Sequence, residues 1–254
     1  AGTGESISHI TPELLYKCYN TFYNPANMIL VLVGDIDIEK ALEYVDKHID
    51  ASRNLGRIER KKVDEPKERV QERIVQDLVV SLPLFRIGLK DNEVGLPSDE
   101  ALKNEIATEL ILEALLGKSS DLYMELYEEG LINGSFDAET EVSDSYGFTL
   151  IGGESKDPEA VYERVKARIK KAADEGIPAE DIERAKKVLV SGNIKMFNSV
   201  ERMGNAFIRQ IIAGYNPLDF KAAADKVSNA DIQRRLAEHF DVNNCVLSVV
   251  MPVK

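Results

Sequence analysis

The sequence predicts an α+β fold in which helices cover a mixed, largely antiparallel sheet. Residues 135–142 and 146–153 have strand patterns and flank a short polar turn, so we expect them to pair as an antiparallel hairpin. After Asp157-Pro158, apolar side chains recur at helical spacing as far as Gly176, which is typical of an amphipathic helix. Strand and helix patterns of these kinds alternate along the chain, so both classes of element are expected in one fold.

Length and composition place the chain in the soluble globular class. Its 254 residues can bury a sizeable core, and 44% of them are hydrophobic and 30% charged. The net charge of −12 disfavours nucleic acids and anionic membranes as partners. No apolar run reaches the roughly 18 residues of a membrane span and no signal peptide opens the chain, so we expect a cytoplasmic protein.

The two cysteines do not suggest a disulfide or a zinc site. Cys18 and Cys245 lie far apart and form no CxxC pair. We expect each of them to be a small buried hydrophobic residue.

The opening residues predict a helix, a strand and a second helix. Thr11-Pro12 is a helix start, residues 28–33 are apolar at every position as in a strand covered on both faces, and Asp37 can cap the next helix. This unit is too small to supply the neighbours that such a strand needs. We therefore expect unpaired edges and apolar faces, and with them association between chains, a swapped strand or docking onto the rest of the chain.

The rest of the sequence predicts strands in 74–90 and a helix from 98 to 116. It also predicts a short helix that Ser119 or Ser120 caps and Gly130 closes. The hairpin and the 157–176 helix follow. Further helices are expected at 178–189, 200–213, 218–227 and 230–240, before a last strand at 245–251. A charged connector divides the chain into a first piece at 1–55, the connector at 56–69 and a second domain at 70–254.

Several motifs occur in the order found in one peptidase family. These motifs are residues 2–7 (GTGESI), 22–28 (FYNPANM), 33–37 (VGDID), 115–123 (LLGKSSDLY), 126–132 (LYEEGLI), 146–153 (YGFTLIGG), and 176–178 (GIP) followed by 182–186 (IERAK). Together they resemble the C-terminal part of a half-molecule of the pitrilysin/insulinase family of zinc peptidases, the inverzincins. The form of the middle motifs is closest to a bacterial processing-protease-like branch.

The resemblance implies a two-domain α+β half-molecule. Residues 1–55 would be the end of the family's first, catalytic domain, and residues 70–254 would be its second domain. The halves or subunits of such proteins close around unfolded peptides. The partners implied are therefore a peptide or unfolded polypeptide and a catalytic half or partner subunit of the same family.

Zinc in such peptidases is held by an HxxEH motif and a downstream glutamate, a set that this chain lacks. None of His9, His48 and His239 lies within five residues of another. Residues 235–239 (RLAEH) imitate the motif, but the guanidinium of Arg235 cannot coordinate zinc, so we interpret them as an ordinary turn of a surface helix. We predict no catalytic and no metal-binding residue here, and zinc only in a region preceding this chain.

The resemblance also indicates candidate substrate-binding residues. In some family members an arginine and a tyrosine of the second half reach across to the substrate. Aligned on residues 126–132, Tyr127 stands in the place of that arginine and Asn133 near that of the tyrosine. Ser119 and Ser120 lie in the matching segment just before. For Tyr127 the alternative is a packing aromatic residue on an amphipathic helix.

Two hypotheses of function follow. The first is a non-catalytic C-terminal portion of a zinc metallopeptidase, inactive alone, that forms one wall of a chamber for peptides or unfolded polypeptides. The alternative is a naturally inactive binding or assembly subunit that partners an active zinc peptidase subunit. Because the opening domain is incomplete, we favour the first. An HxxEH encoded upstream of Ala1 would distinguish it from the second.

Overall fold

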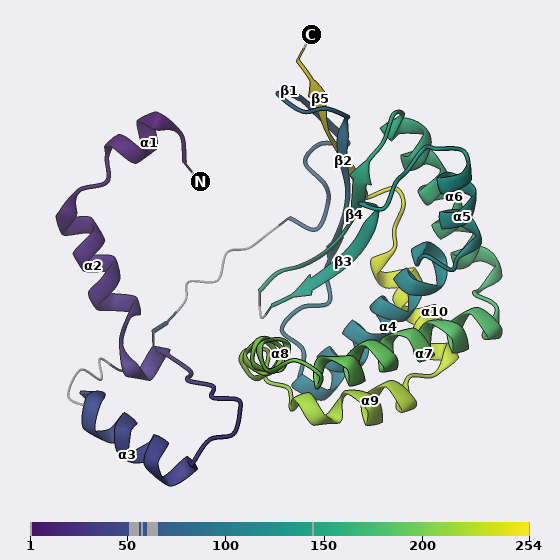
Figure 1. Cartoon of the computed structure of the whole chain (residues 1–254). Coiled ribbons are helices and arrows are strands. Elements are labelled where there is room, and N and C mark those ends of the chain that lie inside the picture. The colour runs from purple at the N-terminus through teal and green to yellow at the C-terminus, as the bar shows by residue number, and fades with distance from the viewer. Residues whose placement is uncertain (1, 51–55, 57, 60–65, 144, 254) are drawn as a thin grey trace.

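The structure is a computed structural model that describes residues 2–50, 56, 58–59, 66–143 and 145–253. In chain order the elements are α1 (Gly4–Ser8), α2 (Pro12–Phe22), η1 (Pro25–Asn27), α3 (Ile38–His48), β1 (Arg73–Leu78), β2 (Leu84–Asp91), α4 (Ser98–Leu116), α5 (Asp121–Glu128), β3 (Asp137–Val142), β4 (Gly147–Glu154), α6 (Pro158–Glu175), α7 (Ala179–Met196), α8 (Val200–Ile212), η3 (Pro217–Asp219), α9 (Phe220–Lys226), α10 (Asn229–His239) and β5 (Val246–Pro252) (Figure 1).

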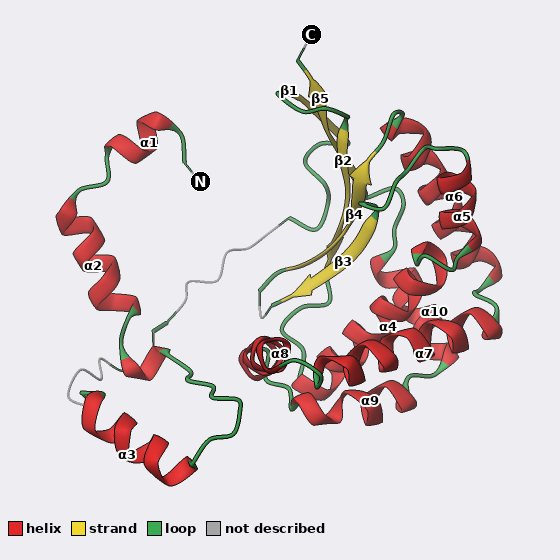
Figure 2. Ribbon diagram, viewed as in Figure 1, coloured by secondary structure: helices red, strands yellow, loops and turns green. Residues whose placement is uncertain are grey.

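The second part of the chain is a five-stranded sheet with helices packed on one face (Figure 2). The strand order is β1-β5-β2-β4-β3. Only the β1–β5 pair is parallel, and the other three pairs are antiparallel. This confirms the predicted fold, a mixed and largely antiparallel sheet covered by helices, including the 135–153 hairpin, which forms β3 and β4.

The core lies between the sheet and the helices. Phe85, Ile87 and Leu89 alternate along β2 and all three are buried against the helices, as their spacing predicts. Ile87 lies opposite Ile151 of β4 on one side and Leu247 of β5 on the other, at the centre of the sheet. α4 is apolar over most of its circumference because β3, α7, α9 and α10 surround it.

Sequence signals set the ends of most helices. The side chain of Ser120 accepts a hydrogen bond from the Tyr123 amide and caps α5, and Gly130 takes a φ of 67° after that helix. Asp157 caps α6, and Gly176, with a φ of 83°, ends it. A capping box between Ser228 and Asp231 starts α10.

A buried ion pair joins β2 to α4 and α10. The guanidinium of Arg235 on α10 donates through both terminal nitrogens to the carboxylate of Asp91, at the end of β2, and through Nε to Thr108 of α4 at 3.0 Å. The side chains of Arg235 and Asp91 are 0% and 1% exposed. Burial raises the pKa of Asp91, but the combined effects of its neighbours, of which the Arg235 hydrogen bonds are the largest, hold that pKa below its ordinary value.

His239 lies one helical turn beyond Arg235 and is also buried. One ring nitrogen, Nδ1, lies 3.2 Å from the Lys90 carbonyl oxygen, and the other, Nε2, lies 2.7 Å from the Thr149 hydroxyl. Burial lowers the pKa of His239 to about 4, so the ring is neutral at pH 7. Our interpretation of residues 235–239 as a surface turn is therefore wrong for Arg235 and His239, because both side chains point into the core.

The opening unit differs from its prediction in one element. Residues 28–33 are extended but form no strand, and none of the strands in the described residues pairs with them. An extended segment becomes a strand only when a neighbour satisfies its backbone. α2 and α3 form with their expected caps, Thr11 and Asp37, yet neither contains a buried residue.

Two further expectations about burial have different outcomes. Cys245 is buried, as predicted, whereas Cys18 is exposed on α2, because nothing in the described residues covers that helix face.

Among the described residues, no helix is both long and apolar enough to cross a lipid bilayer. Much of the connector at 56–69 lies outside the described residues, so the boundaries at 55 and 70 stay a prediction.

The buried ion pair gives a prediction about stability. Arg235→Ala should reduce the free energy of unfolding by about 3–5 kcal/mol, because it leaves the Asp91 carboxylate buried without its partner. The measurement is urea denaturation followed by circular dichroism. Arg202→Ala, which removes an exposed arginine from α8, is the control and should change stability by less than about 0.5 kcal/mol. Equal losses in the two variants would contradict this account of the core.

Candidate functional site

A cleft of about 1110 Å³ lies along the edge of the sheet. β3 forms one wall, and α4, α7 and α8 form the others together with residues 93–96. β3 is the last strand of the sheet, so its outer edge faces this cleft. The cleft therefore combines an open strand edge with side chains from three helices.

The register of the hairpin shows which backbone groups of β3 face outward. The Ser143 amide donates to the Tyr146 carbonyl at 2.8 Å, which sets the alternation of hydrogen bonds between β3 and β4. By that alternation, every second residue bonds to β4 and the residues between direct their N–H and C=O groups away from it. The residues with outward groups are Ala138, Thr140 and Val142. In the described part of the chain, no strand pairs with this edge.

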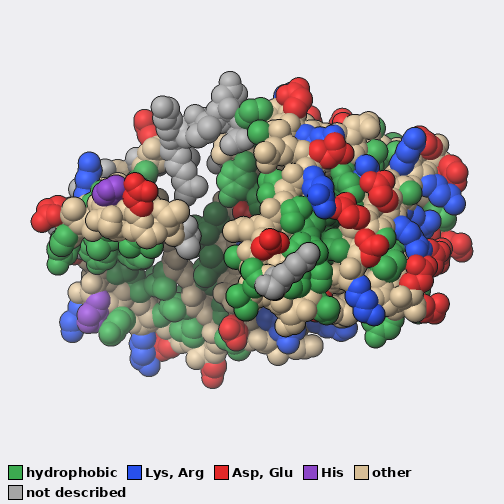
Figure 3. All heavy atoms as spheres, turned by 90° about the horizontal axis from the view of Figure 1, so that it is seen from above, with side chains coloured by type: hydrophobic (Ala, Val, Ile, Leu, Met, Phe, Trp, Pro, Cys, Tyr) green, Lys and Arg blue, Asp and Glu red, His purple; other side chains and the backbone are tan. Residues whose placement is uncertain are grey.

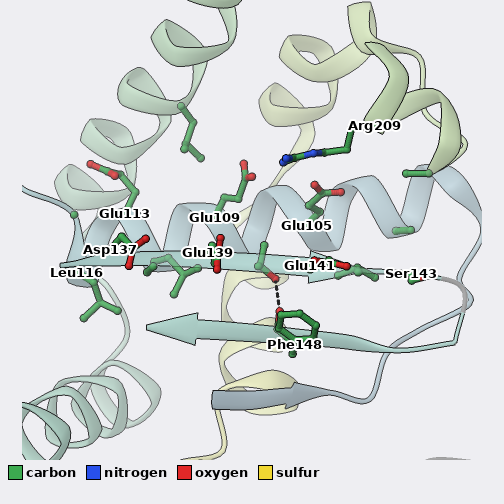
Figure 4. Close-up of a pocket in the computed structure, with 18 of the residues that line it drawn as sticks. Glu105, Glu109, Glu113, Leu116, Asp137, Glu139, Glu141, Ser143, Phe148 and Arg209 are labelled. Carbon is green, nitrogen blue, oxygen red and sulfur yellow. Dashed lines mark hydrogen bonds between the residues drawn. The ribbon is translucent and has the colours of Figure 1, made fainter. Parts of the chain in front are cut away.

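Two rows of carboxylates line the cleft, and Figure 4 shows them side by side. The α4 row consists of Glu105, Glu109 and Glu113. The β3 row consists of Asp137, Glu139 and Glu141. Figure 4 also shows Arg209 of α8 directed toward the α4 row. The cleft is thus strongly acidic on two of its walls.

The β3 row lies on the face of the sheet away from the helices. Arg86 of β2 donates to Asp137 at 2.6 Å by crossing Gly152 of β4, where any Cβ would collide with the Phe85 carbonyl oxygen and with Arg86 itself. The outward-bonding residues at 138, 140 and 142 have their side chains on the opposite face, toward α4. The two acidic rows therefore flank the free edge of β3 from its two sides.

Burial raises the pKa of all three carboxyls in the α4 row. The pKa of Glu109 rises from 4.5 to about 7, because burial and the nearby charge of Glu105 disfavour ionisation more than Arg209 favours it. Burial raises the pKa of Glu105 despite the hydrogen bond from Tyr215 and the charge of Arg209. Burial likewise raises the pKa of Glu113. This row is half-desolvated, whereas the β3 row is more exposed.

The structure brings one of the four predicted substrate-binding residues into the cleft. Ser119 lines it, and its hydroxyl accepts a hydrogen bond from Arg184 at 3.1 Å. Ser120 is buried and caps α5. Tyr127 is 53% exposed and stacks on Tyr123, with ring centroids 6.0 Å apart, outside the cleft.

Asn133, the fourth of these residues, organises the loop before β3. Its side-chain amide donates to Glu154 at 2.7 Å and accepts from the Ser135 amide at 2.8 Å. It does not line the cleft. Whether any of the four residues contacts a peptide stays a prediction.

Neither acidic row was among the site residues predicted from the sequence. The signals were available: Glu105, Glu109 and Glu113 recur every fourth residue in an otherwise apolar helix, and acidic residues alternate in the strand at 137–141. The spacing of Glu109 and Glu113 also equals that of the two histidines in the HxxEH motif. Among the described residues, however, no group of three or more His, Cys, Asp or Glu side chains is arranged to hold a metal ion.

Comparison with known proteins identifies the family. The pattern of the family described as Peptidase M16 inactive domain matches residues 9–189. The chain belongs to this family. It is also 34% identical, over 254 residues, to the uncharacterized zinc protease YmfH of Bacillus subtilis, with 99% of this chain and 59% of YmfH covered. These matches confirm the resemblance to the C-terminal part of a pitrilysin-type zinc peptidase.

Solved structures support the M16 fold over the whole chain. An M16-like peptidase from Alicyclobacillus acidocaldarius superposes with a TM-score of 0.87 at 26% identity, over 100% of this chain and 61% of that one. The peptidase M16 inactive domain from Pseudomonas fluorescens gives a TM-score of 0.72 at 18% identity, over 100% of this chain and 60% of that one. This M16 chain therefore spans about three fifths of the length of YmfH and of these two structures.

The raised pKa of Glu109 predicts how stability depends on pH. Because the folded-state pKa lies above the unfolded value, the contribution of Glu109 is fully present below pH 4.5 and is lost as the pH rises through about 7. Glu109→Gln should therefore stabilise the fold at pH 8 by about 1–2 kcal/mol after allowance for partial exposure, and raise the melting temperature by roughly 4 °C. At pH 5 the two proteins should melt within roughly 1 °C of each other.

Differential scanning fluorimetry at both pH values makes this measurement. Glu100→Gln, at an exposed position on the same helix, is the control. The account of Glu109 is wrong if Glu109→Gln melts no higher than the wild type at pH 8.

Proposed function

We propose that this M16 chain is the non-catalytic C-terminal portion of a zinc metallopeptidase and forms one wall of the chamber that holds an unfolded polypeptide. The observation that carries the proposal is the free edge of β3 along the cleft. A strand edge binds an extended peptide through main-chain hydrogen bonds and so accepts many sequences. That property suits a chamber wall for unfolded substrates better than a pocket for one small ligand.

The family relationship supports the same role. YmfH, of which this chain covers 59%, is described as a zinc protease, and the matching family pattern is described as an inactive domain. In this proposal the zinc, its activated water and the cleavage step belong to the portion of such proteins that this chain does not match. The residues of this chain hold and orient the polypeptide.

The alternative remains a naturally inactive subunit that partners an active one. YmfH and the Alicyclobacillus acidocaldarius peptidase are both longer than this chain. This favours the first proposal over the alternative. In either case polypeptide binding at the β3 edge is expected, so the binding experiment tests the role that the two share.

The exposed apolar side chains of residues 7–49 form a second surface at which another protein can bind. These apolar side chains are 39–71% exposed, and they include Leu15, Phe22, Leu30, Leu42 and Tyr44. Figure 3 shows apolar side chains on the N-terminal segment, to the left as in Figure 1. A surface of this kind on a soluble protein marks a contact with another protein. The catalytic half or a partner subunit of the same family is the occupant that we propose.

Thr140→Pro tests polypeptide binding at the β3 edge. Proline removes an outward N–H of β3 but no hydrogen bond to β4, and an edge strand tolerates it at such a position. The variant should bind a fluorescein-labelled, reduced and carboxymethylated polypeptide at least about tenfold more weakly, because one main-chain hydrogen bond is lost and the edge is blocked sterically. Fluorescence anisotropy measures the affinity, and circular dichroism checks the fold.

Thr140→Val is the matched control. It keeps the N–H group and removes only the hydroxyl, which donates to the Phe148 carbonyl and accepts from the Thr149 hydroxyl, both at 3.3 Å. Its affinity should stay within about twofold of the wild type, since both bonds are long and lie within the hairpin. The proposed function fails if the wild-type chain binds no unfolded polypeptide, or if the two variants bind equally.

The apolar segment at 7–49 predicts that the isolated chain associates with itself. Analytical ultracentrifugation should show dimers or larger species at about 100 µM, because these side chains find no cover within the described residues of one chain. The double substitution Leu15→Asp and Leu30→Asp should shift the distribution to monomers. A wild-type chain that stays monomeric at this concentration would contradict the prediction.

A further inference from the structure

The spacing of the α4 row is close to that of side chains on an extended peptide. Its three glutamates are four residues apart, and an α-helix rises about 1.5 Å per residue, so their positions repeat about every 6 Å along the helix. Side chains on one face of a β-strand repeat about every 6.8 Å. Over three residues the two repeats differ by less than about 2 Å, a difference that long side chains can absorb.

The α4 row also lies on the correct side of the free edge. A residue that pairs with Ala138, Thr140 or Val142 shares the face of its partner, which is the face toward α4. α4 packs along β3, and in Figure 4 the α4 row runs from Glu113 at the Asp137 end of the strand to Glu105 at the Glu141 end. Three alternate side chains of a strand added to β3 would therefore face the three glutamates in succession.

The charges of this row are poorly compensated within the chain. No ion pair within the described residues involves any of the three glutamates, although Arg209 and Arg184 act on them from a greater distance. No hydrogen bond to the Glu109 carboxylate is found in the part of the chain that the structure describes. A half-buried carboxylate without a partner destabilises the fold, and glutamine would avoid this. A cationic ligand would supply the missing partner.

The β3 row is less suited to this role. Asp137 is already paired with Arg86, and Glu141 accepts a hydrogen bond from the Tyr146 hydroxyl at 3.1 Å. Glu139 is exposed to solvent, where an ion pair contributes little. Charge selectivity should therefore come mainly from the α4 row.

We infer that the cleft selects extended polypeptide segments with lysine or arginine at alternate positions, whose backbone pairs with the β3 edge and whose cations pair with Glu105, Glu109 and Glu113. This inference rests on the proposed function and specifies its substrate class. Arg209 acts in it as an internal competitor, because its guanidinium is directed toward the same carboxylates that the peptide would occupy (Figure 4).

The test uses three labelled octapeptides at pH 8, above the pKa of Glu109. The first has alternating lysine and threonine, the second has the same composition with its lysines in one block, and the third has glutamate in place of lysine. Anisotropy titrations should show the alternating lysine peptide binding at least about tenfold more tightly than the glutamate peptide and about threefold more tightly than the block peptide.

Variants of this M16 chain test whether the α4 row causes the preference for the alternating lysine peptide. Glu109→Gln should weaken binding of the alternating lysine peptide by about five- to tenfold, whereas Glu100→Gln, which removes the same charge from an exposed position of α4, should change it less than twofold. Arg209→Ala should strengthen binding, because it removes the competitor. Melting curves confirm that each variant is folded.

The outcomes separate the inference from the proposed function. The inference is overturned if the lysine and glutamate peptides bind alike, if the alternating and block peptides bind alike, or if Glu109→Gln weakens binding no more than Glu100→Gln. In those cases the loss of binding in Thr140→Pro would still support the chamber wall. If no unfolded polypeptide binds the wild-type chain, the proposed function fails and the inference with it.

Discussion

The buried contact between Arg235 and Asp91 is the constraint on which the second part of the chain depends. It connects the end of a central strand with two helices, and one of these helices, α4, carries the acidic row of the cleft. Buried charges are stable only when they are paired and hydrogen-bonded, so the three elements can pack in only one relative arrangement without a large penalty. The position of α4 against β3, and hence the shape of the cleft, follows from that arrangement.

The free edge of β3 must avoid pairing with strands of other folded molecules and still be open to an extended polypeptide. An open strand edge can pair with any other strand, and charged residues on such a strand are a common defence against aggregation. Asp137, Glu139 and Glu141 give β3 this protection on its exposed face. Because α4, α7 and α8 surround the same edge, a folded sheet cannot reach it easily, whereas a single extended segment can enter the cleft.

Membership of the M16 family and the properties of the cleft complement each other. The family relationship indicates a zinc protease context but assigns no residue of this chain to the chemistry. The cleft provides a strand edge and desolvated carboxylates, which are suited to binding and to charge selection. If the proposed function holds, the polypeptide selected by this part of the protein can change without any change at a metal site in another part.

The sequence by itself determined the local elements. The prolines, glycines and capping residues placed most helices and the hairpin within a few positions, since these signals act between neighbouring residues. The tertiary structure decided the rest. Arg235 and Asp91 are 144 positions apart, so nothing near Arg235 in the sequence distinguishes it from a surface arginine.

The same limit applies to the strand that was predicted at 28–33 and to the cleft. An apolar run predicts that a segment will be covered, but a strand also needs a partner, and which partner is present is a property of the fold. The acidic rows have a visible period in the sequence, yet only the packing of α4 beside β3 brings them to one cleft. Local chemistry set the elements because it acts over a few residues, and the site arose from contacts between segments that the sequence leaves far apart.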